Sequence, residues 1–87
     1  MRTQHSSEIV AAIRAKLADH RLPLARPSQM WAGDGSGEPC DACDQPIPRD
    51  DVEYEAQFLP GGTFRFHRKC FDTWHQERAA HMQPPRA

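Results

Sequence analysis

Two short pairs of residues with metal-binding side chains frame the C-terminal half of this 87-residue chain. Cys40 and Cys43 are separated by two residues, and His67 and Cys70 repeat that spacing after an interval of 23 residues. Two such pairs, brought together by folding, supply the four thiolate and imidazole groups of a tetrahedral zinc site. The spacing therefore predicts one structural Zn²⁺ per chain, held by Cys40, Cys43, His67 and Cys70.

Two alternatives to this ligand set stay open. His75 follows Cys70 by five residues, but on a helix its direction would differ from that of Cys70 by more than a quarter turn, so His67 is preferred as the fourth ligand. The cysteines could instead be buried free thiols, which are common in protein cores. Three cysteines are an odd number and do not form a closed disulfide framework.

Composition gives an independent reason to expect a metal. Hydrophobic residues make up 38% of the chain, beside eight prolines and five glycines, and the mean hydropathy is -0.80. A domain this small buries a modest fraction of its surface and usually needs an additional source of stability, such as a disulfide or a bound metal. A bound metal would supply the missing stability.

The first element expected is an amphipathic helix from Ser7 to about His20. Ile9, Val10, Ile13 and Leu17 have the spacing of one helical face, and Arg14, Lys16 and Asp19 are placed elsewhere on the wheel. Pro23 prevents the helix from continuing past Leu22. A helix of this length is marginal by itself in water, so it is expected to dock on another surface.

The segment from Leu22 to Pro39 is rich in proline and glycine and predicts an irregular connector. Met30 and Trp31 interrupt it and are expected to pack back on the domain. Trp31 could instead be an exposed binding hot spot, but a core position is preferred. The run from Gly33 to Gly37 is interpreted as a flexible linker, because it lacks the strand, helix and lysine of a phosphate-binding loop.

The interval between the ligand pairs predicts a β-hairpin followed by a helix. From Val52 to Leu59 apolar residues alternate with Glu53, Glu55 and Gln57, which are assigned to the solvent face. Pro60-Gly61-Gly62 supplies the turn, and Thr63 to His67 returns as a second strand. Helical spacing then runs from about Arg68 to His81, with Phe71 and Trp74 on one side, before Pro84 and Pro85.

These patterns predict a small α+β zinc-binding domain with an additional N-terminal helix. The expected divisions are the amphipathic helix at 1–22, the connector at 23–38, the zinc domain at 39–82 and a disordered tail at 83–87.

A zinc knuckle, a hairpin and a helix with ligands at its start resemble a treble-clef zinc finger. The Cys-x2-Cys-x23-His-x2-Cys spacing is similar to the first zinc module of a LIM domain, over about residues 38 to 80. A LIM domain would continue with a second ligand set, where this chain has Thr73 and no further cysteine. The resemblance thus implies a treble clef with a single zinc. The run from Trp31 to Gly37 also resembles one found in short bacterial proteins, which implies no activity.

The charge balance argues against a general attraction to nucleic acid or anionic lipid. The formal net charge is -1, and no window is apolar enough to span a membrane, so a cytoplasmic protein is expected. Arg65, Arg68 and Lys69 surround the second ligand pair and can offset the net negative charge of three thiolates, one imidazole and Zn²⁺. The alternative is that these three residues contact nucleic-acid phosphates.

The sequence predicts a structural site and not an enzyme. Four protein ligands close the coordination sphere, whereas a catalytic zinc keeps an open position. The preferred function is a zinc-stabilised module that binds another protein or a second copy of itself through the N-terminal helix and the Trp31 segment. A nucleic-acid-binding zinc finger or transcriptional regulator using Arg65, Arg68 and Lys69 is the alternative. A redox role for Cys40 and Cys43 ranks last, because no thioredoxin-like context surrounds them.

Overall fold

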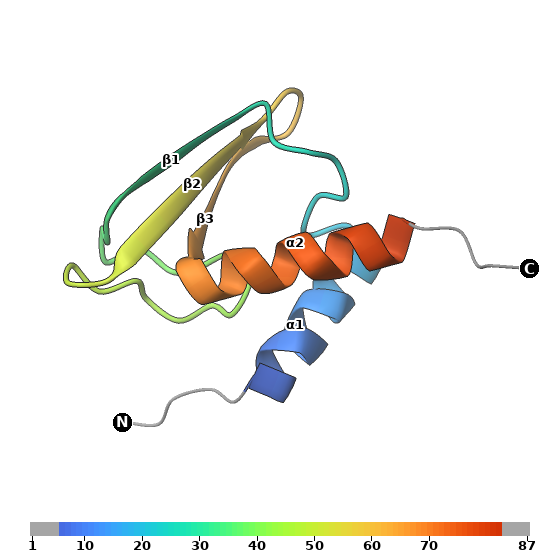
Figure 1. Cartoon of the computed structure of the whole chain (residues 1–87), viewed down its shortest axis with the longest axis horizontal. Helices are drawn as coiled ribbons and strands as arrows, with labels where there is room; N and C mark the ends of the chain where they lie inside the picture. The colour runs from blue at the N-terminus through green and yellow to red at the C-terminus, as the bar shows by residue number, and fades with distance from the viewer. Residues whose placement is uncertain (1–5, 83–87) are drawn as a thin grey trace, which may run out of the picture.

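A computed structural model describes residues 6–82 and shows a small α+β fold, as predicted. The strands form one antiparallel sheet, and α2 lies between that sheet and α1 (Figure 1). The predicted tail at 83–87 lies outside the described residues. The elements are α1 (Ser6–Ala18), β1 (Gln29–Asp34), β2 (Val52–Phe58), β3 (Gly62–His67) and α2 (Arg68–Met82).

Strands β2 and β3 form the predicted hairpin. They pair in register, with Tyr54 opposite Phe66 and Ala56 opposite Phe64. The turn between them needs glycine, because Gly61 and Gly62 both have positive φ angles, of 137° and 92°. Side chains alternate across the sheet, so the apolar residues of both strands share the face that packs against α2.

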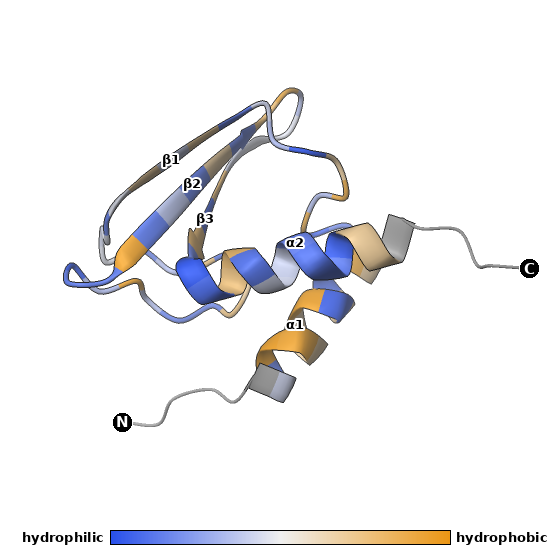
Figure 2. Cartoon of the chain, viewed as in Figure 1, coloured by the Kyte–Doolittle hydropathy of each residue, from blue (hydrophilic) through white to orange (hydrophobic). Residues whose placement is uncertain are grey.

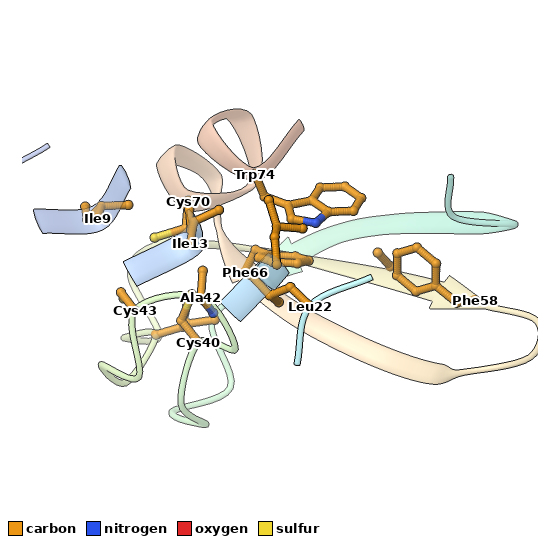
Figure 3. Packing of buried hydrophobic residues seen from close by; sticks show 13 residues of the cluster. Ile9, Ile13, Leu22, Cys40, Ala42, Cys43, Phe58, Phe66, Cys70 and Trp74 are labelled. Atoms are coloured by element: carbon orange, nitrogen blue, oxygen red, sulfur yellow. Dashed lines mark hydrogen bonds between the residues drawn. The ribbon is translucent and has the colours of Figure 1, made fainter. Parts of the chain in front are cut away.

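The core is organised around Trp74 of α2, which is fully buried. Its ring stacks on Phe66 at a centroid distance of 5.4 Å and meets the edge of Phe58 at 5.9 Å. The indole Nε1 donates a hydrogen bond to the Pro23 carbonyl at 3.0 Å, so the polar atom of the ring is also satisfied. Figure 3 shows the aromatic rings at one end of this core and the three cysteines at the other.

Helix α1 packs against α2 beside the face that α2 turns to the sheet. Ile9, Ile13 and Leu17 are buried in the common core, and the apolar character of α1 contrasts with the polar surface of α2 in Figure 2. An ion pair between Arg14 and Glu77, 2.7 Å from Nε to Oε1, also joins the two helices. The helix therefore docks within its own chain.

The segment predicted to be an irregular connector contains strand β1. It pairs with β2, with Met30 opposite Ala56 and Trp31 opposite Glu55. The expectation that Met30 and Trp31 pack into the domain is wrong, because their exposed fractions are 38% and 50%. Strand β1 is held in position by backbone hydrogen bonds to β2 rather than by buried side chains. The alternation of apolar residues in the sequence gives no indication of such backbone bonds.

The run from Gly33 to Gly37 is also ordered, which corrects the prediction of a flexible linker. Gly35 is buried, and a Cβ at this position would overlap the Pro48 carbonyl. The backbone amide and the hydroxyl of Ser36 both donate to Glu53 Oε1, at 3.0 and 2.6 Å. Glu53 is consequently 6% exposed rather than on the solvent face where alternation placed it. Among residues 6–82, neither helix is long and apolar enough to cross a membrane.

Candidate metal centre

The fold brings together all four residues of the predicted ligand set. The Sγ atoms of Cys40, Cys43 and Cys70 and a ring nitrogen of His67 lie within 4.8 Å of one another. The three cysteines are buried, and His67 is half-buried. These residues form a Cys3His group that could hold one metal ion.

The first pair is held by a tight turn between Cys40 and Gln45. The Asp44 amide donates to the Cys40 carbonyl, and the Cys40 amide donates to the Gln45 carbonyl, both at 2.8 Å. Asp44 takes a positive φ of 68°, which aspartate tolerates better than most residues. The Ala42 amide also points at Cys40 Sγ, at 3.4 Å, and would stabilise negative charge on that sulfur.

The second pair lies at the junction of β3 and α2. His67 ends the strand and Cys70 lies in the first helical turn, with no residue between the two elements. The Nδ1 atom of His67 is 3.4 Å from Cys43 Sγ and 3.8 Å from Cys70 Sγ, and its Nε2 is 3.1 Å from the Pro46 carbonyl oxygen.

This arrangement fixes the tautomer of His67 in the form that a metal requires. A carbonyl oxygen only accepts hydrogen bonds, so the imidazole proton is on Nε2 and is donated to Pro46. The lone pair of Nδ1 then faces the sulfurs. Histidine ligands of metals characteristically donate their second ring nitrogen to such an acceptor, so His67 fits the role of a ligand.

The electrostatics of the three thiols also fit a cation. Hydrogen bonds from the Cys43 and Cys70 thiols hold the pKa of Cys40 well below its usual range. The bond to Cys40 in turn raises the pKa of Cys43, and bonds to Cys40 and Cys43 raise that of Cys70. The three thiols therefore form one hydrogen-bonded cluster, and a bound cation would favour the ionised form of all three.

His75, the alternative ligand, lies away from this group. Its side chain is exposed on α2 and stacks on Phe71 with a ring-centroid distance of 6.1 Å. It is not among the residues that gather at the site. The structure thus favours His67 over His75.

Lys16 supports the turn from Cys40 to Gln45, which we call the knuckle. The sequence pattern had placed this lysine off the apolar face of the helix. Its Nζ donates to the Asp41 carbonyl at 2.9 Å and to Asp44 Oδ1 at 2.7 Å, and the residue is only 7% exposed. The signal was present in the helical spacing, because Lys16 follows Ile9 by seven residues and Ile13 by three. A lysine on an apolar stripe needs a polar partner, which the knuckle supplies.

Replacing Lys16 with methionine is expected to destabilise the folded protein by about 1–3 kcal/mol, because the Asp41 carbonyl loses its partner inside the structure. The matched control is Lys69→Met, since Lys69 is exposed on α2. Urea denaturation of both metal-loaded variants measures the difference. Equal midpoints would contradict a supporting role for Lys16.

The basic residues near the second pair do not act as one cluster. The Arg65 side chain faces two carboxylates, with Nε 3.3 Å from Glu53 Oε2 and Nη2 3.5 Å from Glu55 Oε2. It contributes to the site through its backbone, because its amide donates to Asp41 Oδ2 at 2.7 Å and its carbonyl accepts from the Asp41 amide at 2.8 Å. Burial raises the pKa of the Asp41 carboxyl. Arg68 and Lys69 are exposed at the start of α2.

Comparison with known proteins adds no assignment: no protein-family model, no curated protein and no solved structure matches this chain. The case for a metal centre therefore rests on the geometry of the Cys3His group itself.

Proposed function

We propose that the Cys3His group binds one Zn²⁺ and that this ion is structural. Three thiolates and an imidazole are the donor set that tetrahedral zinc prefers. The observation that carries the proposal is that all four donor atoms lie within 4.8 Å of one another. Four protein ligands fill the coordination sphere and leave no position for a water or a substrate, so we propose no catalytic role.

The likeness to a treble-clef zinc finger belongs to the same proposal. The knuckle at Cys40–Cys43, the β2–β3 hairpin and helix α2 follow one another in the order of that architecture. The isolated bridge between Pro39 and Pro46 closes the knuckle as a short loop. A single-zinc treble clef resembling the first module of a LIM domain is the interpretation that these features support.

We further propose that the zinc-stabilised domain is a module that binds proteins. The apolar face of α1 is covered within the chain, so the contact surface that we propose is strand β1, where Met30 and Trp31 are exposed. Exposed aromatic residues are enriched at the centres of protein interfaces. A nucleic-acid interface has less support, because the Arg65 side chain faces Glu53 and Glu55.

Metal analysis of two histidine variants tests the zinc site directly. Wild-type protein, purified without added metal or chelator, is expected to carry one zinc per chain by native mass spectrometry. His67→Ala is expected to lose most of it, because a structural zinc needs its fourth donor. His75→Ala is the matched control and should retain one zinc.

Two results would contradict this proposal. A folded wild-type protein without metal would show that the thiols form an ordinary apolar core. Loss of zinc in His75→Ala, with retention in His67→Ala, would show that the ligand set is wrong.

A further inference from the structure

Strand β1 is held only by β2. It contacts neither helix among the described residues, all six of its residues are exposed, and Figure 1 shows it at the side of the sheet farthest from α1. Edge strands of this kind usually carry a charged residue, most often lysine, a proline or a bulge that blocks pairing with another chain. The sequence of β1, QMWAGD, has no lysine or proline, its one charged residue, Asp34, is the last of the strand, and its register with β2 is unbroken.

The hydrogen-bond pattern shows which backbone groups of β1 face away from β2. The Gly35 amide donates to the Asp51 carbonyl at 2.9 Å, which continues the β1–β2 register by one pair. Bonded and non-bonded pairs alternate in antiparallel sheets. The amides and carbonyls of Met30, Ala32 and Asp34 therefore point to the free edge.

The opposite edge of the sheet is treated differently. There the outward amide and carbonyl of Arg65 on β3 both bond to Asp41 of the knuckle. Within residues 6–82, no hydrogen bond from outside the sheet reaches Met30, Ala32 or Asp34. The knuckle therefore covers the β3 edge at Arg65, whereas no such contact covers the outward groups of β1 in the described residues.

We propose that β1 pairs antiparallel with β1 of a second copy of this chain, about a two-fold axis at Ala32. This inference rests on the proposed function as a protein-binding module and names its partner. In this register Ala32 pairs with Ala32 of the second copy, and Met30 pairs with Asp34 in both directions. All three outward amides and all three outward carbonyls of each copy are then bonded, and the two sheets become one.

Side chains fit this register as well as the backbone does. Trp31 comes to lie opposite Gly33 of the second copy in a non-bonded pair, where facing residues are closest. A Cβ at Gly33 would have no atom within 4 Å, so open space is available there for the indole ring. The only charge in β1, Asp34, lies opposite Met30, so no like charges face each other.

A register centred on Trp31 is the main alternative and satisfies fewer groups. It would place Asp34 opposite Ser28 of the second copy. The Ser28 amide already donates to the Gln57 carbonyl at 2.7 Å. The Ala32-centred pairing is thus the one that uses every free group of the edge.

Sedimentation equilibrium of the zinc-loaded protein tests the proposal, with Ala32→Pro and Ala32→Val as a matched pair. Wild type should show a reversible monomer–dimer equilibrium. Proline removes the outward amide of each copy but is tolerated at a sheet edge, so Ala32→Pro should raise the dimer dissociation constant on the order of 10-fold or more. Ala32→Val keeps the amide and should dimerise like wild type.

Isotope-filtered NMR on a mixture of labelled and unlabelled wild type gives the register without any variant. A contact between Hα of Trp31 in one copy and Hα of Gly33 in the other is expected. Wild type that stays monomeric up to about 1 mM, where binding free energies are near 4 kcal/mol, would overturn the inference, as would a dimer unaffected by Ala32→Pro. A zinc-loaded monomer would leave the zinc site intact, so the two failures are distinguishable.

Discussion

Removing the metal from the wild-type protein is expected to abolish its folded structure. Structural zinc in small domains contributes about 10–16 kcal/mol, whereas whole domains are stable by about 5–15 kcal/mol. Without a cation, the three buried cysteine sulfurs lie too close to one another for all of them to be ionised. An excess of a high-affinity chelator at neutral pH should therefore eliminate the helical circular dichroism signal and the dispersion of the amide NMR spectrum.

A pair of substitutions on α2 separates metal loss from other effects of the chelator. Cys70→Ala removes a ligand and should resemble the chelated protein even with zinc present. Asp72→Ala changes an exposed residue two positions away and should fold normally. Adding zinc back to the chelated wild type should restore the spectrum. A chelated protein that keeps a cooperative thermal transition would show that the apolar core is sufficient alone.

The Cys3His group and the hairpin could be predicted because the pattern behind each is local in the sequence. The spacing of Cys40 and Cys43 defines a turn, and alternation from Tyr54 to Phe58 defines the buried face of a strand. Each pattern depends on neighbours within a few residues. The structure confirms the hairpin and brings the four ligand residues together.

The features that the sequence did not predict depend on partners far along the chain. Glu53 is buried because Ser36 folds over it, and Lys16 is buried because the knuckle accepts its hydrogen bonds. Strand β1 exists because β2 offers a free edge, which the composition of residues 23–38 does not reveal. Burial of a charge is favourable only where such partners are present, and single-residue patterns do not locate them.

The knuckle is tied to the rest of the protein at three points. Lys16 connects it to α1, Asp41 connects it to β3, and the Pro46 carbonyl holds His67. A metal bound at the proposed site would therefore fix segments that come from the beginning, the middle and the end of the chain.

The two tryptophans should differ sharply in their contribution to stability. Trp74→Ala removes a fully buried ring that contacts Phe58, Phe66 and Phe71, and should cost about 3–5 kcal/mol. Trp31→Ala removes a half-exposed ring on β1 and should change stability by no more than about 0.5 kcal/mol. Urea denaturation of dilute, zinc-loaded protein measures both.

This comparison needs dilute protein because Trp74 is proposed to act within one chain and Trp31 between two chains. Trp74 holds α2 on the sheet within one chain, so its loss should lower the unfolding midpoint at every protein concentration. Trp31 is proposed to contact a second copy, so its loss should lower the midpoint only where dimers form. Equal effects of the two substitutions in dilute solution would mean that Trp31 is part of the core, and the assignment of β1 as a contact surface would then be wrong.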